Sequence, residues 1–153
     1  MKLIINSLEE MKTLSSHLAH LASPDDVYLL KGDLGAGKTT FSQFFGQALG
    51  VNKTISSPTF TIIKSYSGRL PFHHMDCYRL EDSDEDLGFD DYFYGEGVTL
   101  VEWPQMIEEF LPPGYLTLTI ERISDDSRQV TVEAHGAHYE NLLEALTHEI
   151  TPY

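Results

Sequence analysis

A buried strand, a glycine-rich loop and a helix start follow one another between residues 27 and 39, and this order constrains the fold more than any other feature. Residues 27–30 are continuously apolar, which is typical of a strand buried in a parallel sheet. Residues 32–39 then match G-x-x-x-x-G-K-[ST], and a helix is expected to begin at Lys38 or Thr39. The sequence therefore predicts a P-loop, in which a strand and a helix hold a phosphate-binding turn between them.

Each residue type in this loop suits the binding of a nucleotide. Gly32, Gly35 and Gly37 allow positive φ angles and a close approach of the backbone to phosphate. Backbone N–H groups and the helix N-terminus form an anion cradle, Lys38 adds a positive charge for the β- and γ-phosphates, and the Thr39 hydroxyl suits Mg²⁺. An ordinary glycine-rich turn is the competing interpretation, and the flanking strand and helix argue against it. The expected phosphate-binding residues are Asp33, Leu34, Gly35, Ala36, Gly37, Lys38, Thr39 and Thr40.

Two carboxylates are expected beside the P-loop. Asp76 lies late in an expected strand over residues 72–78, and Glu102 follows the apolar run 98–101 in the manner of a Walker B acid. Glu102 is favoured as the metal-side acid because the run before it is more uniformly apolar, and Asp76 is its rival. Lys38, Asp76 and Glu102 are thus the candidate catalytic residues. The adjacent His73 and His74 should point to opposite faces of their strand and make a poor metal pair.

The rest of the chain completes an α/β pattern. A strand is expected at residues 2–6, followed by a helix with Ser7 as its N-cap, which ends near residues 23–25. Residues 115–120 and 129–133 should form a terminal β pair, and residues 138–148 a last amphipathic helix. We therefore expect a P-loop NTPase fold: a mostly parallel central sheet flanked by helices, with additional antiparallel strands, in a single domain spanning residues 1–153.

Size, charge and cysteine usage narrow the function further. The chain has 153 residues and one cysteine, Cys77, which fits a reducing compartment, and no apolar run approaches the length of a membrane span. The apolar stretch within residues 1–5 is too short for the apolar region of a signal peptide, so we expect a cytoplasmic protein. We also expect the isolated chain to be a monomer. A net charge of −14 without a basic stripe argues against direct, tight binding of RNA or DNA.

An acidic segment in the middle of the chain is a candidate docking surface for a basic partner. Residues 81–91 are rich in aspartate and glutamate, and the aromatic residues beside them supply apolar anchors. The alternative is a solvated, partly helical surface. The carboxylates are Glu81, Asp82, Asp84, Glu85, Asp86, Asp90 and Asp91, and the anchors are Leu87, Phe89, Tyr92, Phe93 and Tyr94.

Five segments together resemble the TsaE family, also called the YjeE family. They are GDLGAGKTT at 32–40, SPTFT at 57–61, HMDCYRL at 74–80, LGFDDY at 87–92 and VEWP at 101–104. They occur in the family's order within roughly residues 7–135. The P-loop alone is unspecific, whereas the combination is highly specific. TsaE proteins are bacterial ATPases needed for threonylcarbamoyl modification of adenosine 37 in tRNAs that read codons beginning with adenine.

The resemblance implies ATP and Mg²⁺ as ligands, weak hydrolysis by the isolated chain, and assembly with the proteins TsaB and TsaD. Thr39 and Glu102 would hold Mg²⁺, directly or through water, while Thr59 and Asp76 would complete the γ-phosphate side. Ser7 and its helix would lie near the base. Contact with tRNA would be indirect, through the partners, in agreement with the acidic charge of this chain.

Two other classes of P-loop protein remain as alternatives. A small-molecule kinase usually carries an arginine-rich lid, and this chain has no such segment. A GTPase usually carries Asn-Lys-x-Asp, but Asn52 and Lys53 lack the final acid and lie too close to the P-loop. The sequence therefore favours adenine, and it favours an ATPase that drives a partner complex over a kinase.

Overall fold

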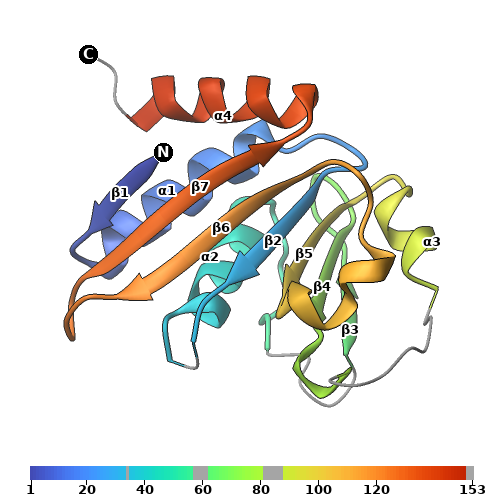
Figure 1. Cartoon of the computed structure of the whole chain (residues 1–153), viewed down its shortest axis with the longest axis horizontal. Coiled ribbons are helices and arrows are strands. Elements are labelled where there is room, and N and C mark those ends of the chain that lie inside the picture. The colour runs from blue at the N-terminus through green and yellow to red at the C-terminus, as the bar shows by residue number, and fades with distance from the viewer. Residues whose placement is uncertain (34, 57–61, 81–87, 151–153) are drawn as a thin grey trace.

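The computed structural model describes residues 1–33, 35–56, 62–80 and 88–150 of the chain. The sequence-based expectations for Leu34, for Thr59 and its loop, and for residues 81–87 of the acidic segment lie outside the described residues. The described parts form an α/β fold around one twisted sheet (Figure 1).

Seven strands of the described residues make up this sheet, in the order β1-β7-β6-β2-β5-β4-β3. The inner strands β6, β2, β5 and β4 are parallel to one another, and β1, β7 and β3 add antiparallel pairs at the two sides. A mostly parallel centre with antiparallel additions is the architecture that the sequence predicted. The strands are β1 Lys2–Ile5, β2 Val27–Lys31, β3 Ile63–Tyr66, β4 Phe72–Asp76, β5 Val98–Glu102, β6 Tyr115–Arg122 and β7 Arg128–His135.

Helices cover both faces of the sheet and bury a separate apolar core on each (Figure 1). Helices α1 (Leu8–Leu21), α2 (Lys38–Ala48) and α4 (Ala137–Ile150) pack on one face. The short helix α3 (Phe89–Phe93) and a 3₁₀ segment, Pro104–Phe110, cover the other. Helix α1 begins as predicted, because the Ser7 side chain accepts a hydrogen bond from the Glu10 backbone N at 3.1 Å.

Two details of the fold differ from the expectations. Strand β4 ends at Asp76, two residues before the predicted end, because the Asp76 carboxylate accepts the backbone N–H of Tyr78 and starts a 3₁₀ turn, Tyr78–Leu80. Phe89 and Phe93 are fully buried in the second core, so they are not surface anchors, whereas Tyr94 is exposed. Within the described ranges, no helix has the length and apolar character needed to cross a membrane.

Candidate functional site

The P-loop follows β2, at the carboxyl end of the parallel strands. Gly32, Gly35 and Gly37 all have positive φ angles, as the sequence predicted. At Gly32 the requirement is also steric, since a Cβ atom there would lie 2.6 Å from the carbonyl oxygen of Ile120 on β6. The loop is therefore seated against the neighbouring strand by backbone contact, and Lys38 begins α2 immediately after it.

Lys38 points back into this loop. Its Nζ donates a hydrogen bond to the Gly32 carbonyl oxygen at 2.6 Å and lies 3.7 Å from the centroid of the Trp103 ring. Burial lowers the pKa of Lys38, and the carboxylates of Glu102, Asp76 and Asp33 oppose part of that shift. The ammonium group thus lies near three carboxylates and inside the loop, where it can also contact phosphate oxygens.

Asp76 and Glu102 are the last residues of two adjacent parallel strands. They are direct partners in the β4–β5 register, so both carboxylates emerge at the sheet edge from which the P-loop leaves β2. Asp76 is 7% exposed and Glu102 is 2% exposed. Glu102 and the Thr39 hydroxyl, in the first turn of α2, offer the hard oxygen ligands that Mg²⁺ prefers.

This donor set fits an ion bound together with a nucleotide better than a preformed metal site. Within the described residues there is no group of three or more His, Cys, Asp or Glu side chains that could hold a metal. Mg²⁺ in nucleotide sites is held by one or two protein oxygens, with water and substrate phosphates completing the octahedron. Glu102, Asp76 and Thr39 are consistent with that pattern.

Two further side chains lie against the Glu102 carboxylate, and the sequence analysis did not assign either to the site. His74 is fully buried, and its Nε2 lies 2.5 Å from Glu102 Oε2. Ser42 on α2 places its Oγ 3.5 Å from the same oxygen and donates a hydrogen bond to the Lys38 carbonyl at 3.0 Å. The expected divergence of the two histidines is correct, since His73 is half-buried and contacts Ser65. The available signal for His74 was its spacing two residues before Asp76, which places both on one face of β4.

A cavity of about 260 Å³ lies on the α1 side of the P-loop. It is lined by Ser7 and Leu8 at the start of α1, by Gly37 and Thr40 at the start of α2, and by Arg128. Ser7 thus lines the same cavity as two residues of the phosphate loop, and its place near the base stays a prediction. The cavity places open space next to Gly37 and Thr40 of the cradle.

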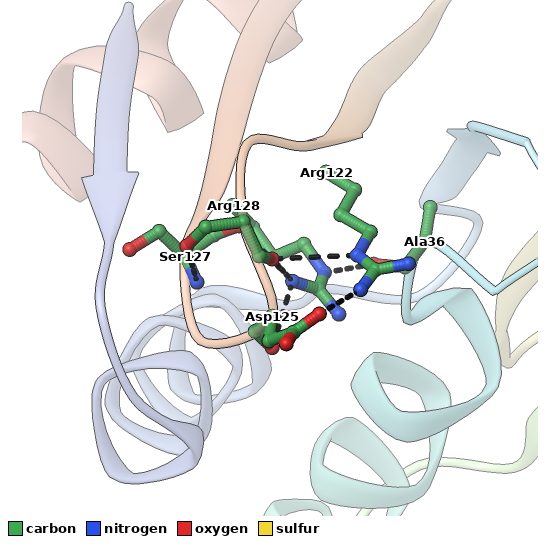
Figure 2. A network of polar contacts seen from close by, with 6 residues as sticks. Ala36, Arg122, Asp125, Ser127 and Arg128 are labelled. Atoms are coloured by element: carbon green, nitrogen blue, oxygen red, sulfur yellow. Dashed lines mark hydrogen bonds and ion pairs between the residues drawn. The ribbon is translucent and has the colours of Figure 1, made fainter.

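Arg128 joins the turn between β6 and β7 to the P-loop. Its Nε donates a hydrogen bond to the Ala36 carbonyl oxygen at 2.9 Å, and its Nη1 donates to the carbonyl oxygens of Ser124 at 2.8 Å and Ser127 at 3.0 Å. Figure 2 shows Arg128 between this turn and the loop before α2, with Arg122 paired to Asp125 beside it. Positions 36 and 128 are 92 residues apart, so no local pattern predicted this contact.

On the opposite side of the loop, Trp103 covers Lys38. Trp103 has a φ of 58°, an unusual value for a bulky residue, and its ring centroid lies 4.9 Å from that of Tyr78. It also lines a cavity of about 420 Å³ together with Asp33, Ala36 and Gln105. Sites with backbone held in sparsely populated conformations are often functional, and this one adjoins the P-loop lysine.

The structure thus brings most of the expected site residues into one region. Asp33, Lys38, Asp76 and Glu102 interact electrostatically, while Ser7, Ala36, Gly37 and Thr40 share a cavity. Leu34 and Thr59 lie outside the described residues. His74, Ser42 and Arg128 are the contacts that the sequence analysis missed.

Comparisons with known proteins agree on one family. The family model described as "Threonylcarbamoyl adenosine biosynthesis protein TsaE" matches residues 5–130. The chain is 53% identical over 140 residues to the tRNA threonylcarbamoyladenosine biosynthesis protein TsaE of Bacillus subtilis, covering 91% of this chain and 89% of the relative. The protein of the same name from Treponema pallidum is 34% identical over 134 residues, with 86% and 99% covered. The crystal structure of Bacillus subtilis YdiB has a TM-score of 0.87 and 44% identity, covering 99% of this chain and 96% of that one.

Proposed function

The chain belongs to the TsaE family, which acts in threonylcarbamoyladenosine biosynthesis on tRNA, and from this premise we propose that it is a Mg²⁺-dependent ATPase. ATP binds at the P-loop, with its phosphates over residues 35–39. The hydrolysis is weak in isolation and is coupled to a complex of TsaB and TsaD, which handles the tRNA.

One observation carries this proposal. The P-loop ammonium group of Lys38 and two strand-end carboxylates, Asp76 and Glu102, share a single water-poor region at the carboxyl edge of the sheet. A cation for phosphate oxygens next to buried acids for a metal is what phosphoryl transfer requires, because the reaction depends on positioning and charge neutralisation.

Each residue has a defined role in this scheme. When the nucleotide binds, the Lys38 ammonium group leaves its hydrogen bond with the Gly32 carbonyl and contacts the β- and γ-phosphate oxygens. The N–H groups of the loop hold the same phosphates. Thr39 and Glu102 hold Mg²⁺, which supplies charge neutralisation on the phosphate oxygens when bound. Asp76 lies next to Glu102 and orients groups on the γ-phosphate side.

The charge of the chain supports an indirect role toward tRNA. Ten lysine and arginine residues stand against 24 aspartate and glutamate residues, and polyanion binding depends on clustered cations. We therefore assign tRNA contact to the partners, and we place the activity in the cytoplasm. Capture of TsaB and TsaD by the tagged chain, with ATP, with ADP or without nucleotide, tests the assembly. Capture that never depends on nucleotide would argue against coupling through this site.

Substitutions in the P-loop test the activity itself. Lys38→Ala should weaken ATP binding strongly in calorimetry, since it removes the cation that faces the β- and γ-phosphates. Thr39→Ala should keep most of the affinity and lose Mg²⁺-dependent hydrolysis, measured as phosphate release in the presence of TsaB and TsaD.

The design of the phosphate-release assay separates the proposed ATPase from a small-molecule kinase and from a GTPase. Phosphate released from ATP without any added acceptor supports an ATPase, whereas a kinase needs its acceptor. GTP serves as the matched nucleotide control. ATP binding by Lys38→Ala that equals that of the parent would overturn the P-loop assignment.

A further inference from the structure

His74 occupies an unusual position for a histidine. It lies in the middle of β4, it is fully buried, and its ring stacks against Phe72 with a centroid distance of 6.0 Å and an interplanar angle of 9°. A phenylalanine or leucine would fill such a place between strand and helix without burying polar atoms. A specific interaction is therefore needed to explain the imidazole.

The ring uses one of its two nitrogens. Nε2 donates to Glu102 Oε2 at 2.5 Å, and a hydrogen bond to a carboxylate is stronger than one between neutral groups. Nδ1 is buried and has no hydrogen-bond partner in the part of the chain that the structure describes. An unpaired buried nitrogen costs free energy, so the contact with Glu102 is what favours histidine at this position.

The same carboxylate oxygen faces α2. Ser42 Oγ approaches Glu102 Oε2 at 3.5 Å from the first turns of the helix that carries Lys38 and Thr39. Both of these side-chain contacts are made at Oε2, so the carboxylate lies between β4 and α2 and is held by the hydrogen bond from His74. A carboxylate gripped by one oxygen keeps one rotamer and presents its other oxygen in a fixed direction.

We propose that His74 is a positioning residue, which holds the Glu102 carboxylate in place for the metal side of the bound nucleotide. This inference rests on the proposed ATPase function. His74 touches neither nucleotide nor metal in this scheme, and its effect passes entirely through Glu102. Loss of the contact should leave the affinity for ATP at saturating Mg²⁺ nearly unchanged, and it should raise the Mg²⁺ concentration needed for hydrolysis.

A matched pair of amide substitutions tests the role. In His74→Gln the side-chain amide nitrogen reaches about the place of the imidazole Nε2 and can still donate to Glu102. In His74→Asn the shorter side chain places its amide near Nδ1 and loses that contact. Both variants replace an aromatic ring with a buried amide, so they share the structural cost and differ in the hydrogen bond.

We expect His74→Asn in the complex with TsaB and TsaD to lose about 10- to 100-fold in hydrolysis and to need about tenfold more Mg²⁺ for half-activation, while His74→Gln stays near the parent. A second readout without turnover is the Mg²⁺ dependence of ATP binding by calorimetry, which should shift in the same variant only. In a Glu102→Gln background, His74→Asn should add no further effect on the Mg²⁺ requirement.

Equal losses in both variants, or a parental Mg²⁺ requirement in His74→Asn, would overturn the positioning role. Thermal melting of both variants shows whether a common loss comes from unfolding. Failure of the proposed function would show in the parent protein, as absence of ATP binding or of phosphate release. Failure of the positioning role shows only in the comparison of the two variants.

Discussion

At the scale of single residues, the two strand-end acids are held differently, and this difference predicts their roles. Glu102 Oε2 accepts a hydrogen bond from His74, with Ser42 Oγ 3.5 Å away, whereas one oxygen of Asp76 accepts the Tyr78 backbone N–H at 3.1 Å and shapes the turn after β4. A buried carboxylate that a side chain of the neighbouring strand holds by a hydrogen bond is well suited to orient a metal, because its position is fixed before the metal binds.

Glu102→Gln should therefore bind ATP but lose most hydrolysis, on the order of 100-fold, because metal-assisted charge stabilisation supplies several kcal/mol. Asp76→Asn should be milder, since the amide oxygen can still accept the Tyr78 N–H. Phosphate release in the assembled complex, with calorimetry for ATP affinity, compares the two. If Glu102→Gln hydrolyses ATP at the parental rate and Asp76→Asn is inactive, the roles must be exchanged.

At the scale of elements, the β6–β7 turn supports the P-loop through Arg128. Its Nε donates to Ala36 while its Nη1 binds turn carbonyls, so the loop and the hairpin are held as one unit (Figure 2). Arg128→Ala should loosen the loop and weaken ATP and ADP binding alike, by on the order of tenfold, equivalent to the loss of one charge-assisted hydrogen bond of about 1.5 kcal/mol.

Arg69 provides the matched control for Arg128. Its guanidinium also donates to backbone carbonyls, those of Ala19 at 2.6 Å and Ala22 at 3.1 Å, but at the end of α1 and not at the P-loop. Arg69→Ala should lower the melting temperature and leave nucleotide affinity unchanged in the folded protein. An equal loss of affinity in both variants would show that general destabilisation, and not the P-loop contact, is responsible.

The elements also show what the sequence could and could not predict. The P-loop, its strand and helix, and the two acids were predictable because each has a local signature of apolar runs, glycines and strand ends. The hydrogen bond between His74 and Glu102 and the one from Arg128 to Ala36 depend on which strands become neighbours in the folded sheet. Such contacts span 28 and 92 residues, and neither periodicity nor spacing specifies them.

At the scale of the whole molecule, three buried side chains that lose a proton at high pH make the stability of the fold depend on pH in the alkaline range. Burial raises the pKa of Tyr139 and of Cys77 to about 12 each, and burial with the nearby Asp26 carboxylate raises that of Tyr28. Tyr28 lies on the central strand, Tyr139 on α4 and Cys77 after β4, so both cores contribute. All three groups hold their protons more tightly in the folded chain than in the unfolded chain.

The direction of the pH effect follows from this difference. As far as these groups are concerned, stability should be constant up to about pH 7.5. It should begin to fall near about pH 8, where Cys77 of the unfolded chain starts to lose its proton, and more steeply from about pH 9.5 toward 12, where the tyrosines of the unfolded chain ionise as well. The slope should approach about 1.4 kcal/mol per pH unit for each group. Urea unfolding at pH 8, 9, 10 and 11 measures it.

Tyr139→Phe separates titration from packing in this experiment. The hydroxyl of Tyr139 accepts the Val27 backbone N–H at 3.0 Å, so the variant should be less stable at neutral pH. Its alkaline slope should nevertheless be shallower, because one titrating group has been removed while Tyr28 and Cys77 remain. A slope equal to that of the parent would show that Tyr139 does not contribute to the alkaline loss and that the remaining buried groups, or others, account for it.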